Sequence, residues 1–406
     1  MSSRLRIVVT GLIAQHPRLG GVAWDYLQYP VGLARLGHDV YYLEDSGEWP
    51  YTDDGGTDPD SWVAHDPTPN VEHLERTLAR FGLADRWMYR FPVEPRWYGL
   101  ADNARREVLE SADLLINVSG TLERPDEYRA IPRMVYVDSD PVFTQVKLAV
   151  LRGQEAFQKR VSLHDVFFSF GERIQSTEFA NGFAWRPTRQ PIVLSEWQPV
   201  EASRDVMTTV MSWTSYRPLR HRGKVYGQKD IELRRFLDLP SAVAPEQLEV
   251  ALGGAFHADW ETDDATGSHE ARTPAERLRA AGWRVTDAAS VASGLDDYRD
   301  YVRSSKGELS VAKHGYVVGR AGWFSCRSAC YLAAGRPAIV EDTGFGDVIP
   351  SGLGVVAFST PDEAVDAVRD VTGDYARHAR AARELASEYF DSDRVLTRLV
   401  EEAIAA

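Results

Sequence analysis

The stretch that decides the fold covers residues 313–341 and reads KHGYVVGRAGWFSCRSACYLAAGRPAIVE. A strand-like run opens it and enters a loop that contains glycine, and Ser325 then begins a predicted helix. Gly335-Arg336-Pro337 ends that helix, and an apolar strand over 338–341 leads into a second polar turn at 342–346. Two successive strand-to-helix turns place a helix N-terminus at the carboxyl edge of a parallel sheet, where open α/β folds bind phosphate-bearing ligands. The stretch therefore predicts a sugar-nucleotide site.

Strands alternate with helices along the rest of the chain, in two successive series. The first contains predicted strands at 6–10, 38–44, 114–118, 133–138 and 166–170, and helices at 24–36 and 103–111. The second contains predicted strands at 206–212, 248–252, 283–286, 308–312, 338–341 and 354–358, and helices at 274–281, 296–304, 361–371, 375–389 and 393–405. A long loop is expected over 45–69 and a proline-rich linker over 185–205. The pattern predicts an α/β fold of two doubly wound Rossmann-like domains that face each other across a cleft.

The composition limits the partners and the compartment. A chain of 406 residues favours two domains, and a formal net charge of −14 argues against a nucleic-acid or anionic-membrane surface, since both need a basic face. No apolar run is long enough to span a bilayer, and the N-terminus leads directly into a strand, so we expect neither an anchor nor a signal peptide. The two cysteines, Cys326 and Cys330, lie four residues apart on one predicted helix and are poorly placed for a disulfide. These features predict a cytoplasmic protein.

The predicted helix N-terminus at Ser325 is the first candidate for anion binding. Ser325 is the expected N-cap, and the free backbone N–H groups of the first turn carry partial positive charge. Arg327 adds a guanidinium that could grip two phosphate oxygens, and Ser328 adds a hydroxyl. The alternative is an ordinary capped helix with Arg327 in solvent. The neighbouring turn contributes three further candidates, Asp342, Thr343 and Gly344.

The most basic segment of this acidic chain covers 217–229 and offers counter-charges for a diphosphate. Lys224 and Lys229 are the preferred phosphate ligands, because cations in a strongly negative protein suit an anionic ligand. A solvated charged loop is the alternative. The remaining donor-side candidates are residues at two neighbouring strand ends, with His314 also open to a purely structural role: Trp213, Thr214, Ser215, His314 and Tyr316.

Candidates in the first half are a close backbone approach and a general base. Gly20 and Gly21 lie in an expected loop after the first strand, where Gly21 would let the backbone approach a donor closely, although the spacing does not match the G-x-G-x-x-G of nicotinamide sites. A base that deprotonates an acceptor hydroxyl has to face the donor from the opposite domain. Its candidates, which could equally be turn or capping residues, are Asp138, Asp140, His16 and Asp25.

The sequence contains no nucleophile elbow, no P-loop, no H-E-x-x-H and no clustered metal ligands. Hydrolase, kinase and metalloprotease activities therefore lose their usual support. We expect no metal, and no cofactor besides a nucleotide-diphosphate sugar that acts as substrate.

The chain resembles glycosyltransferases of the GT-B type, in particular bacterial group 1 and spore-maturation-protein-like members. The resemblance rests on the glycine pair followed by WDY at 24–26 and LGHDV at 36–40, and on WFSCRSACYLAAGRP at 323–337 followed by EDTG. It implies three parts of the chain, namely an acceptor-side domain over 1–195, a nucleotide-sugar domain over 196–385, and a last helix over 386–406 that packs back on the first domain.

One feature of the resemblance departs from the family pattern. Many retaining relatives carry a Glu-x7-Glu pair in this region, and Gly322 and Cys330 stand at those positions here. Ribose and sugar recognition are therefore expected to differ, and the stereochemical outcome stays open.

These observations predict a metal-independent, hexosyltransferase-type glycosyltransferase that moves a sugar from a nucleotide-diphosphate sugar to a hydroxyl of a small-molecule or glycan acceptor. Two alternatives stay open. One is a sugar-nucleotide epimerase of the same fold, and the other is a binding protein without chemistry, which the missing glutamate pair favours.

Overall fold

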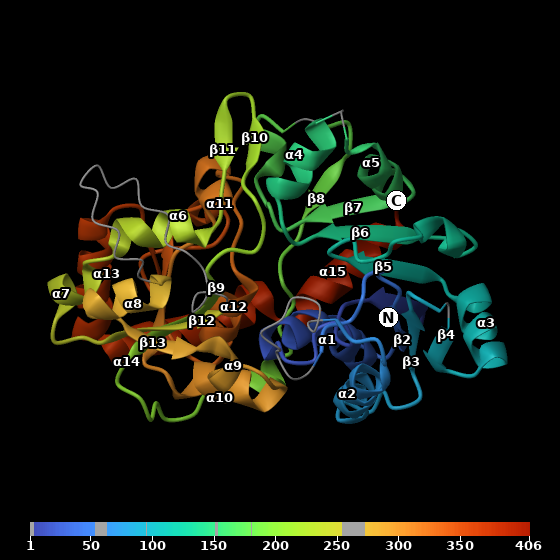
Figure 1. The fold of residues 1–406 in the computed structure, drawn as a ribbon, viewed down its shortest axis with the longest axis horizontal. Coiled ribbons are helices and arrows are strands. Elements are labelled where there is room, and N and C mark those ends of the chain that lie inside the picture. Colours follow the sequence, from blue (N-terminus) through green and yellow to red (C-terminus); the bar gives the residue numbers. More distant parts are fainter. Residues whose placement is uncertain (1–3, 53–62, 95, 151–152, 180, 254–272) are drawn as a thin grey trace. The chain divides into compact units, whose positions relative to one another are not determined.

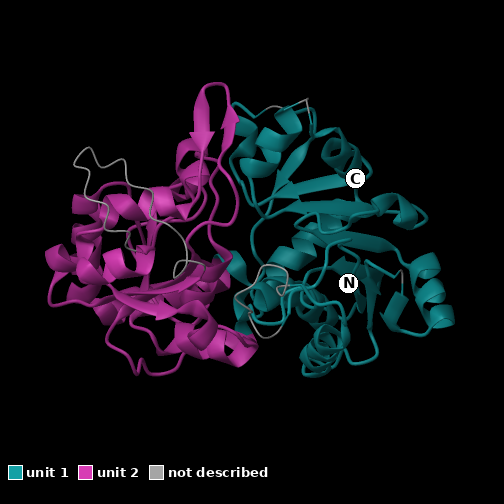
Figure 2. Cartoon of the chain, viewed as in Figure 1, with its two compact units in different colours: residues 1–194, 389–406 teal, residues 195–388 magenta. Residues whose placement is uncertain are grey.

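The computed structural model describes residues 4–52, 63–94, 96–150, 153–179, 181–253 and 273–406. The chain divides into two compact units (Figure 2). Unit 1 consists of residues 1–194 and 389–406, and unit 2 of residues 195–388. No helix among the described residues is both long and apolar enough to cross a bilayer.

Unit 1 is built on an eight-stranded sheet with the order β4-β3-β2-β1-β5-β6-β7-β8 (Figure 1). Its neighbouring strands run parallel except for the antiparallel pair β3–β4. The strands are β1 (Arg6–Thr10), β2 (Asp39–Glu44), β3 (Trp87–Phe91), β4 (Arg96–Gly99), β5 (Leu114–Val118), β6 (Met134–Asp138), β7 (Val166–Ser169) and β8 (Trp185–Pro187). The helices are α1 (Gly20–Arg35), α2 (Thr68–Ala79), α3 (Asp102–Ser111), α4 (Phe143–Ala149), α5 (Glu155–Ser162) and α15 (Ser392–Ile404).

Unit 2 is built on a six-stranded parallel sheet with the order β13-β12-β9-β14-β15-β16. The strands are β9 (Met207–Ser212), β12 (Leu248–Gly253), β13 (Arg284–Asp287), β14 (Gly307–Ser310), β15 (Ala338–Glu341) and β16 (Val355–Phe358), and a separate hairpin joins β10 (Leu219–His221) to β11 (Lys224–Tyr226). The helices are α6 (Lys229–Leu233), α7 (Leu239–Val243), α8 (Pro274–Ala280), α9 (Ala288–Val291), α10 (Leu295–Ser304), α11 (His314–Gly319), α12 (Cys326–Ala333), α13 (Pro361–Gly373) and α14 (Tyr375–Leu385).

The strand order of unit 2 reverses at β9. The chain runs outward from β9 through β12 to β13, then returns to the other side of β9 with β14, β15 and β16. The carboxyl ends of β9 and β14 therefore form a topological switch point, which is where ligands bind in open α/β sheets.

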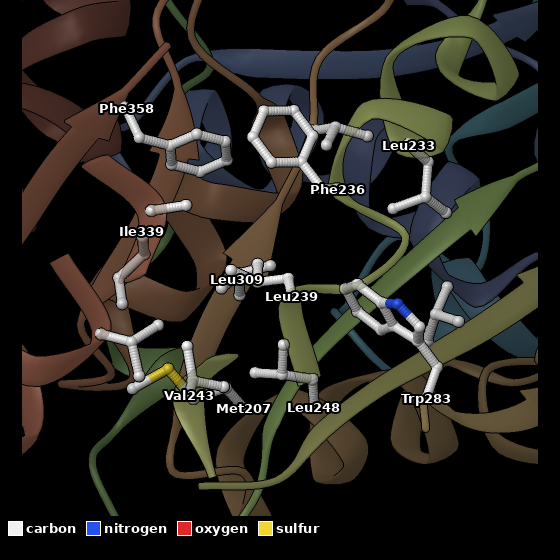
Figure 3. Packing of buried hydrophobic residues seen from close by; sticks show 14 of the residues in the cluster. Met207, Leu233, Phe236, Leu239, Val243, Leu248, Trp283, Leu309, Ile339 and Phe358 are labelled. Carbon is white, nitrogen blue, oxygen red and sulfur yellow. The ribbon is translucent and has the colours of Figure 1, made fainter. Parts of the chain in front are cut away.

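The core of unit 2 lies between this sheet and its helices. Met207, Leu309, Ile339 and Phe358 come from four strands and are at most 2% exposed, and Phe236 packs edge-on against Phe358 at 5.1 Å between ring centroids (Figure 3). Burial of each such side chain contributes about 1.5–3 kcal/mol. The strands read as continuous apolar runs because helices cover both faces of a parallel sheet.

The predicted α/β class with two doubly wound, Rossmann-like parts is confirmed. Three local predictions are wrong. Gly20 and Gly21 form the first turn of α1 rather than a loop, and the strand-like run after Lys313 is helix α11. In the described structure, the segment 314–319 pairs with no strand. Its Tyr316 stacks on Trp323 with 4.0 Å between the ring centroids, which a helical turn allows. The predicted helix over 375–389 ends earlier, because a π-helical turn covers Ala386–Phe390.

Several elements received no prediction from the sequence, namely β3, β4, β8, α2, α4, α5, α6, α7, α9 and the β10–β11 hairpin. Most are short. Part of the loop expected over 45–69 lies outside the described residues, and α2 begins within its last two positions.

Candidate functional site

A cavity opens in unit 2 one strand away from the switch point. It is a small cavity between the carboxyl ends of β14 and β15 and the first turn of α12. Its polar lining comes from Ser310, Glu341, Ser325, Arg327, Ser328 and Thr343. Five of these six belong to the stretch quoted first or to the turn after it, so the cavity lies where the two successive turns were predicted to meet.

The first turn of α12 offers hydrogen-bond donors to this cavity. Ser325 is the N-cap by backbone position, but its hydroxyl makes no capping bond to the helix. The hydroxyl of Ser328 is buried and has no partner among the described residues. The helix begins with backbone N–H groups that lack intrahelical acceptors and carry partial positive charge. An acceptor group with negative charge matches all of these donors.

Arg327 uses its guanidinium for hydrogen bonds within the protein, whereas the sequence predicted that it would bind two phosphate oxygens. Its Nε donates to Oε1 of Glu308 at 2.6 Å, its Nη1 donates to the carbonyl of Val210 at 2.7 Å, and its Nη2 donates to the hydroxyl of Ser310. Glu308 is fully buried, so this carboxylate needs the guanidinium as its counter-charge. Arg327 therefore links β9 to β14 at the switch point, and its charge is largely compensated.

Lys229, the first residue of α6, is the lysine in this region without an ion pair among the described residues. Burial, followed by the nearby charges of Arg327 and Lys313, lowers the pKa of the Lys229 ammonium well below its usual value. No hydrogen bond or ion pair joins Lys229 to a carboxylate in the part of the chain that the structure describes. The carboxylate of Glu308 offsets these like charges only in part, so a bound anion would favour the ammonium form of Lys229.

Lys313 is fixed beside this position by two aromatic rings. Its Nζ donates to the hydroxyl of Tyr216 at 3.2 Å and lies 4.9 Å and 5.4 Å from the ring centroids of Tyr216 and Tyr316. Cation–π contacts hold a charge in place without neutralising it. Tyr316, predicted as a donor ligand, therefore contacts Lys313 and stacks on Trp323.

His314 contacts a buried pair of carboxyl groups, Glu232 and Glu341, through Glu232. Its Nδ1 lies 2.5 Å from Oε1 of Glu232, and Arg235 donates to both Glu232 and Glu341, the latter at 3.1 Å. Burial, and then the hydrogen bond with Glu232, raises the pKa of Glu341. Burial alone would raise the pKa of Glu232, but hydrogen bonds from His314, Glu341 and Arg235 lower it overall. Burial beside Glu232 therefore favours the protonated form of Glu341, whose oxygens accept from Arg235 and from the N–H of Ala312 at the cavity wall.

The polar turn after β15 is held by its own hydrogen bonds. Asp342 pairs with Arg320 at 2.8 Å and accepts from the N–H of Gly344 at 2.7 Å, and the hydroxyl of Thr343 donates to the carbonyl of Trp323. Gly344 adopts a φ of 87°, which glycine reaches without strain. These side chains shape the cavity wall, so a ligand role for Asp342 and Thr343 would need their present bonds to break.

The remaining donor-side candidates, in and after the turn that follows β9, differ in how exposed they are. Trp213 is 2% exposed and belongs to the apolar core of unit 2, so it is not available to stack on a sugar. Thr214 and Ser215 are exposed, and Lys224 is exposed on β11.

Among the predicted bases, Asp138 is the one that the structure argues against. It is 1% exposed, and its carboxylate accepts from Gln145 at 3.0 Å, Ser169 at 2.9 Å and the N–H of Asp140 at 3.1 Å. Burial raises its pKa to about 6. Because both oxygens are used inside the fold, Asp138 fixes the turn after β6 rather than reaching a substrate.

His16 stays a base candidate in unit 1, together with Asp25 and Asp140, which are half-buried. Burial lowers the pKa of His16 to about 4, so the imidazole is neutral at pH 7 but a weaker base than an ordinary histidine. It stacks on Tyr51 with 5.0 Å between ring centroids. Gly21 is half-buried in the first turn of α1.

Four buried glutamates shape these two regions and were missed from the sequence, namely Glu44, Glu232, Glu308 and Glu341. Glu44 illustrates their role, because it accepts from the N–H groups of Ala14 at 2.9 Å and Gln15 at 2.6 Å and so fixes the segment that carries His16. Burial raises its pKa to about 7. The only signal in the sequence is a glutamate that ends an apolar strand, at Glu44 and again at Glu341.

No family model matches the chain, and no curated protein sequence is significantly similar to it. Solved structures are similar over the whole length. An alpha-glucosyltransferase solved with UDP and DNA shares 11% identity, with a TM-score of 0.59 over 98% of this chain and 99% of that one. HepE from Anabaena, solved with UDP and glucose, shares 10% identity, with a TM-score of 0.57 over 99% and 100%. Sucrose-phosphate synthase from Thermosynechococcus elongatus shares 13% identity, with a TM-score of 0.50 over 99% and 100%.

The chain has the GT-B fold. The resemblance expected from the sequence is thereby confirmed at the level of the fold, by structures whose sequences differ at almost nine positions in ten. Within this GT-B chain, the cavity and the cations lie in unit 2, which follows the proline-rich segment, and the remaining base candidates lie in unit 1.

Proposed function

We propose that the protein is a glycosyltransferase that binds a nucleoside-diphosphate sugar in unit 2 and transfers the sugar to a hydroxyl of a small-molecule or glycan acceptor. The observation that carries the proposal is the cavity at the first turn of α12, lined by the unpartnered buried hydroxyl of Ser328, with Lys229 near Arg327 and without an ion pair among the described residues. The UDP complexes of two similar structures support a nucleotide ligand.

The reaction breaks the bond between the anomeric carbon and a phosphate oxygen and forms a bond between that carbon and the acceptor oxygen, and negative charge develops on the leaving diphosphate. Lys229, Lys313, the hydroxyls of Ser325 and Ser328, and the N-terminus of α12 are positioned to stabilise that charge. The acceptor hydroxyl loses its proton to a base, for which His16, Asp25 and Asp140 are the candidates in unit 1.

We propose that the reaction needs no metal ion, because fixed cations and helix donors would neutralise the diphosphate. The described residues contain no group of three or more His, Cys, Asp or Glu side chains that could hold one. Addition of EDTA should leave turnover unchanged, and restoration of activity by Mg²⁺ after EDTA treatment would contradict this part of the proposal.

A thermal-shift screen against UDP, GDP, dTDP and ADP sugars tests the proposal. At about 100 times the dissociation constant, a donor that binds only the folded state adds about 2.7 kcal/mol of stability. One nucleotide should raise the Tm clearly above the others, and that donor should then lose its sugar to a hydroxyl compound in an acceptor mixture. If no nucleotide raises the Tm, the donor site is not where we place it.

Binding without chemistry is the second candidate function. Cys330, which replaces a glutamate of the family pattern, is 2% exposed and lies inside the helix packing, so it offers no polar contact to a ribose. A Tm shift without consumption of any donor would favour this candidate. Conversion of the nucleotide sugar in the absence of acceptor would instead indicate an epimerase.

A further inference from the structure

The β10–β11 hairpin is a concentrated basic element in an otherwise acidic chain. Between Asp205 and Asp230 the sequence contains no Asp or Glu, and it carries five basic residues, Arg217, Arg220, Arg222, Lys224 and Lys229. The whole chain has 60 acidic against 46 basic residues. Figure 1 shows the hairpin projecting from the body of unit 2, and its two strands form a sheet of their own.

The hairpin has one packed face and one outward face. Leu219 pairs with Tyr226, and Arg220 pairs with Val225, so the two pairs point to opposite faces. Tyr226 is fully buried, which identifies its face as the one packed on unit 2. Arg220 is therefore on the outward face, where it is exposed.

The turn of the hairpin places an arginine where the backbone disfavours it. Arg222 and Gly223 have φ values of 48° and 78°, the combination of a type I′ turn, in which Asn, Asp and Gly are preferred. A left-handed conformation costs a residue other than glycine about 1–2 kcal/mol. An arginine that bears this cost at an exposed tip points to a role for its charge.

Three exposed arginines, here called the outward arginines, lack ion pairs in the described part of the chain: Arg217 lies just before β10, Arg220 on β10 and Arg222 in the turn. Most other arginines of unit 2 with a described partner pair within one or two turns, as Arg235 does with Glu232 and Arg299 with Asp296. The hairpin thus keeps a positive potential that the rest of the surface neutralises.

The hairpin is also attached to the proposed donor site. Only Gly227 and Gln228 separate Tyr226 from Lys229, and the carbonyls of these two residues accept from the N–H groups of Gly315 at 3.0 Å and His314 at 3.3 Å. Arg222 precedes Lys229 by seven residues, which limits the distance between their Cα atoms to about 25 Å. An arginine at this range lies within reach of a short glycan whose other end reacts at the donor.

We propose that the outward arginines of the hairpin recognise an anionic acceptor, a sugar or glycan that carries a carboxylate or a phosphate. This inference rests on the proposed transfer reaction, and it names the chemical class of acceptor. Arginine forks pair with both groups through two parallel hydrogen bonds. The donor diphosphate has its own cations at Lys229 and Lys313, so the hairpin charges serve a different anion.

Charge and shape favour this partner over larger anionic surfaces. Nucleic-acid binding normally adds exposed aromatic rings to a long basic stripe, and the aromatic residue of the hairpin, Tyr226, is buried. An anionic bilayer attracts each arginine by about 1 kcal/mol, against the repulsion of a chain with a net charge of −14. The described residues 206–229 contain no exposed large apolar side chain for insertion.

Titration of the full chain with charged and neutral probes tests the proposal. The probes are trigalacturonate, glucose 6-phosphate and neutral maltotriose, each added in the presence of UDP. The test variant is Arg217→Gln/Arg220→Gln/Arg222→Asn, in which Asn suits the left-handed turn and keeps the hairpin folded. The matched control is Arg284→Gln, an exposed arginine at the amino end of β13.

We expect at least one anionic probe to bind the parent and the control equally, and the triple variant about tenfold more weakly. Binding should also weaken in about 0.5 M NaCl, where the Debye length is about 4 Å. Equal affinity for anionic and neutral probes, or equal affinity of parent and triple variant, overturns the inference. Binding of DNA or of phosphatidylglycerol vesicles that depends on the arginines, with no binding of either small anion, overturns it as well.

UDP affinity, measured separately, distinguishes this inference from the proposed function. The triple variant should bind UDP as the parent does. If the parent binds no nucleotide, the donor site fails, whereas the probe titration still reports on the hairpin. If the parent binds UDP but neither anionic probe, the hairpin inference alone fails.

Discussion

At the scale of single residues, the charged groups around the cavity divide into those used by the fold and those left for a ligand. Arg327 and Glu308 are used by the fold, because the guanidinium places all three of its nitrogens on β9 and β14. Lys229 has no such partner among the described residues. The positions of Arg327 and Lys229 in the sequence suggest a ligand role for each of them equally. Their buried partners show which of them the fold already uses.

Replacement of Arg327 by methionine should destabilise the protein rather than act on turnover alone. The change leaves the carboxylate of Glu308 buried without its counter-charge, which costs about 3–5 kcal/mol. Urea unfolding measures the loss. The double variant Arg327→Met/Glu308→Gln should recover a large part of it, since it removes the buried charge. A single variant within about 1 kcal/mol of the parent would contradict the assignment.

The pair of Glu341 and Glu232 should make stability depend on pH. The raised pKa of Glu341 means that the folded state holds a proton that the unfolded state releases above about pH 4.3, so this group makes stability fall as the pH rises from there towards the raised pKa. Glu341→Gln keeps the hydrogen bond to Glu232 without a titrating proton. The slope of unfolding free energy against pH should therefore be flatter in this variant between pH 5 and 8. An identical slope in parent and variant would show that Glu341 is ionised in the fold.

At the scale of elements, the first turn of α12 brings the site together. Ser328→Ala removes a buried hydroxyl that has no partner, so stability should stay the same or increase. The affinity for a nucleotide sugar should fall about three- to tenfold, because the ligand loses a donor. Ser241→Ala on α7, an exposed serine whose hydroxyl donates to Asp238, is the matched control and should leave the affinity unchanged. A loss of stability without loss of affinity in Ser328→Ala would assign the hydroxyl to the fold.

The elements that the sequence predicts well are those whose ends are marked by glycine, proline or capping residues. Gly335 and Pro337 end α12, and Pro361 after Thr360 begins α13 with a capping box, so both helices follow from local chemistry. The strand over 308–312 was predicted two residues too long, since the sheet pairing stops at Ser310. Helix α11 was missed because six residues with two glycines carry no helical periodicity.

The candidate site could be predicted only in part, for a physical reason. The start of α12 after Ser325 was predicted correctly from local chemistry, and the ligand roles of this helix N-terminus and of Lys229 stay predictions. The roles of Arg327, Trp213 and Asp138 depend on which groups become buried beside them, and that is decided by tertiary packing. The same holds for Glu232 and Glu308, which reveal themselves only through their partners.

At the scale of the whole molecule, the end of the chain stabilises its beginning. Helix α15 packs on α1, and a Cβ added at Gly32 would lie 2.5 Å from Cδ1 of Leu396. Leu396→Ala should cost about 2–5 kcal/mol, since the side chain is fully buried. Hydrogen exchange should accelerate in α1 and α15, whereas the nucleotide affinity of unit 2 should not change. Exchange that accelerates in unit 2 alone would contradict this division.

The measurement that tests the central claim most directly is calorimetric titration of Lys229→Met with the nucleotide sugar that gives the largest thermal shift. The affinity should fall at least about tenfold, or about 1.4 kcal/mol. The Tm of the unliganded protein should rise, because the charges of Arg327 and Lys313 no longer oppose a third cation. Lys159→Met on α5, an exposed lysine, controls for the loss of one charge. Unchanged affinity in Lys229→Met would contradict the account.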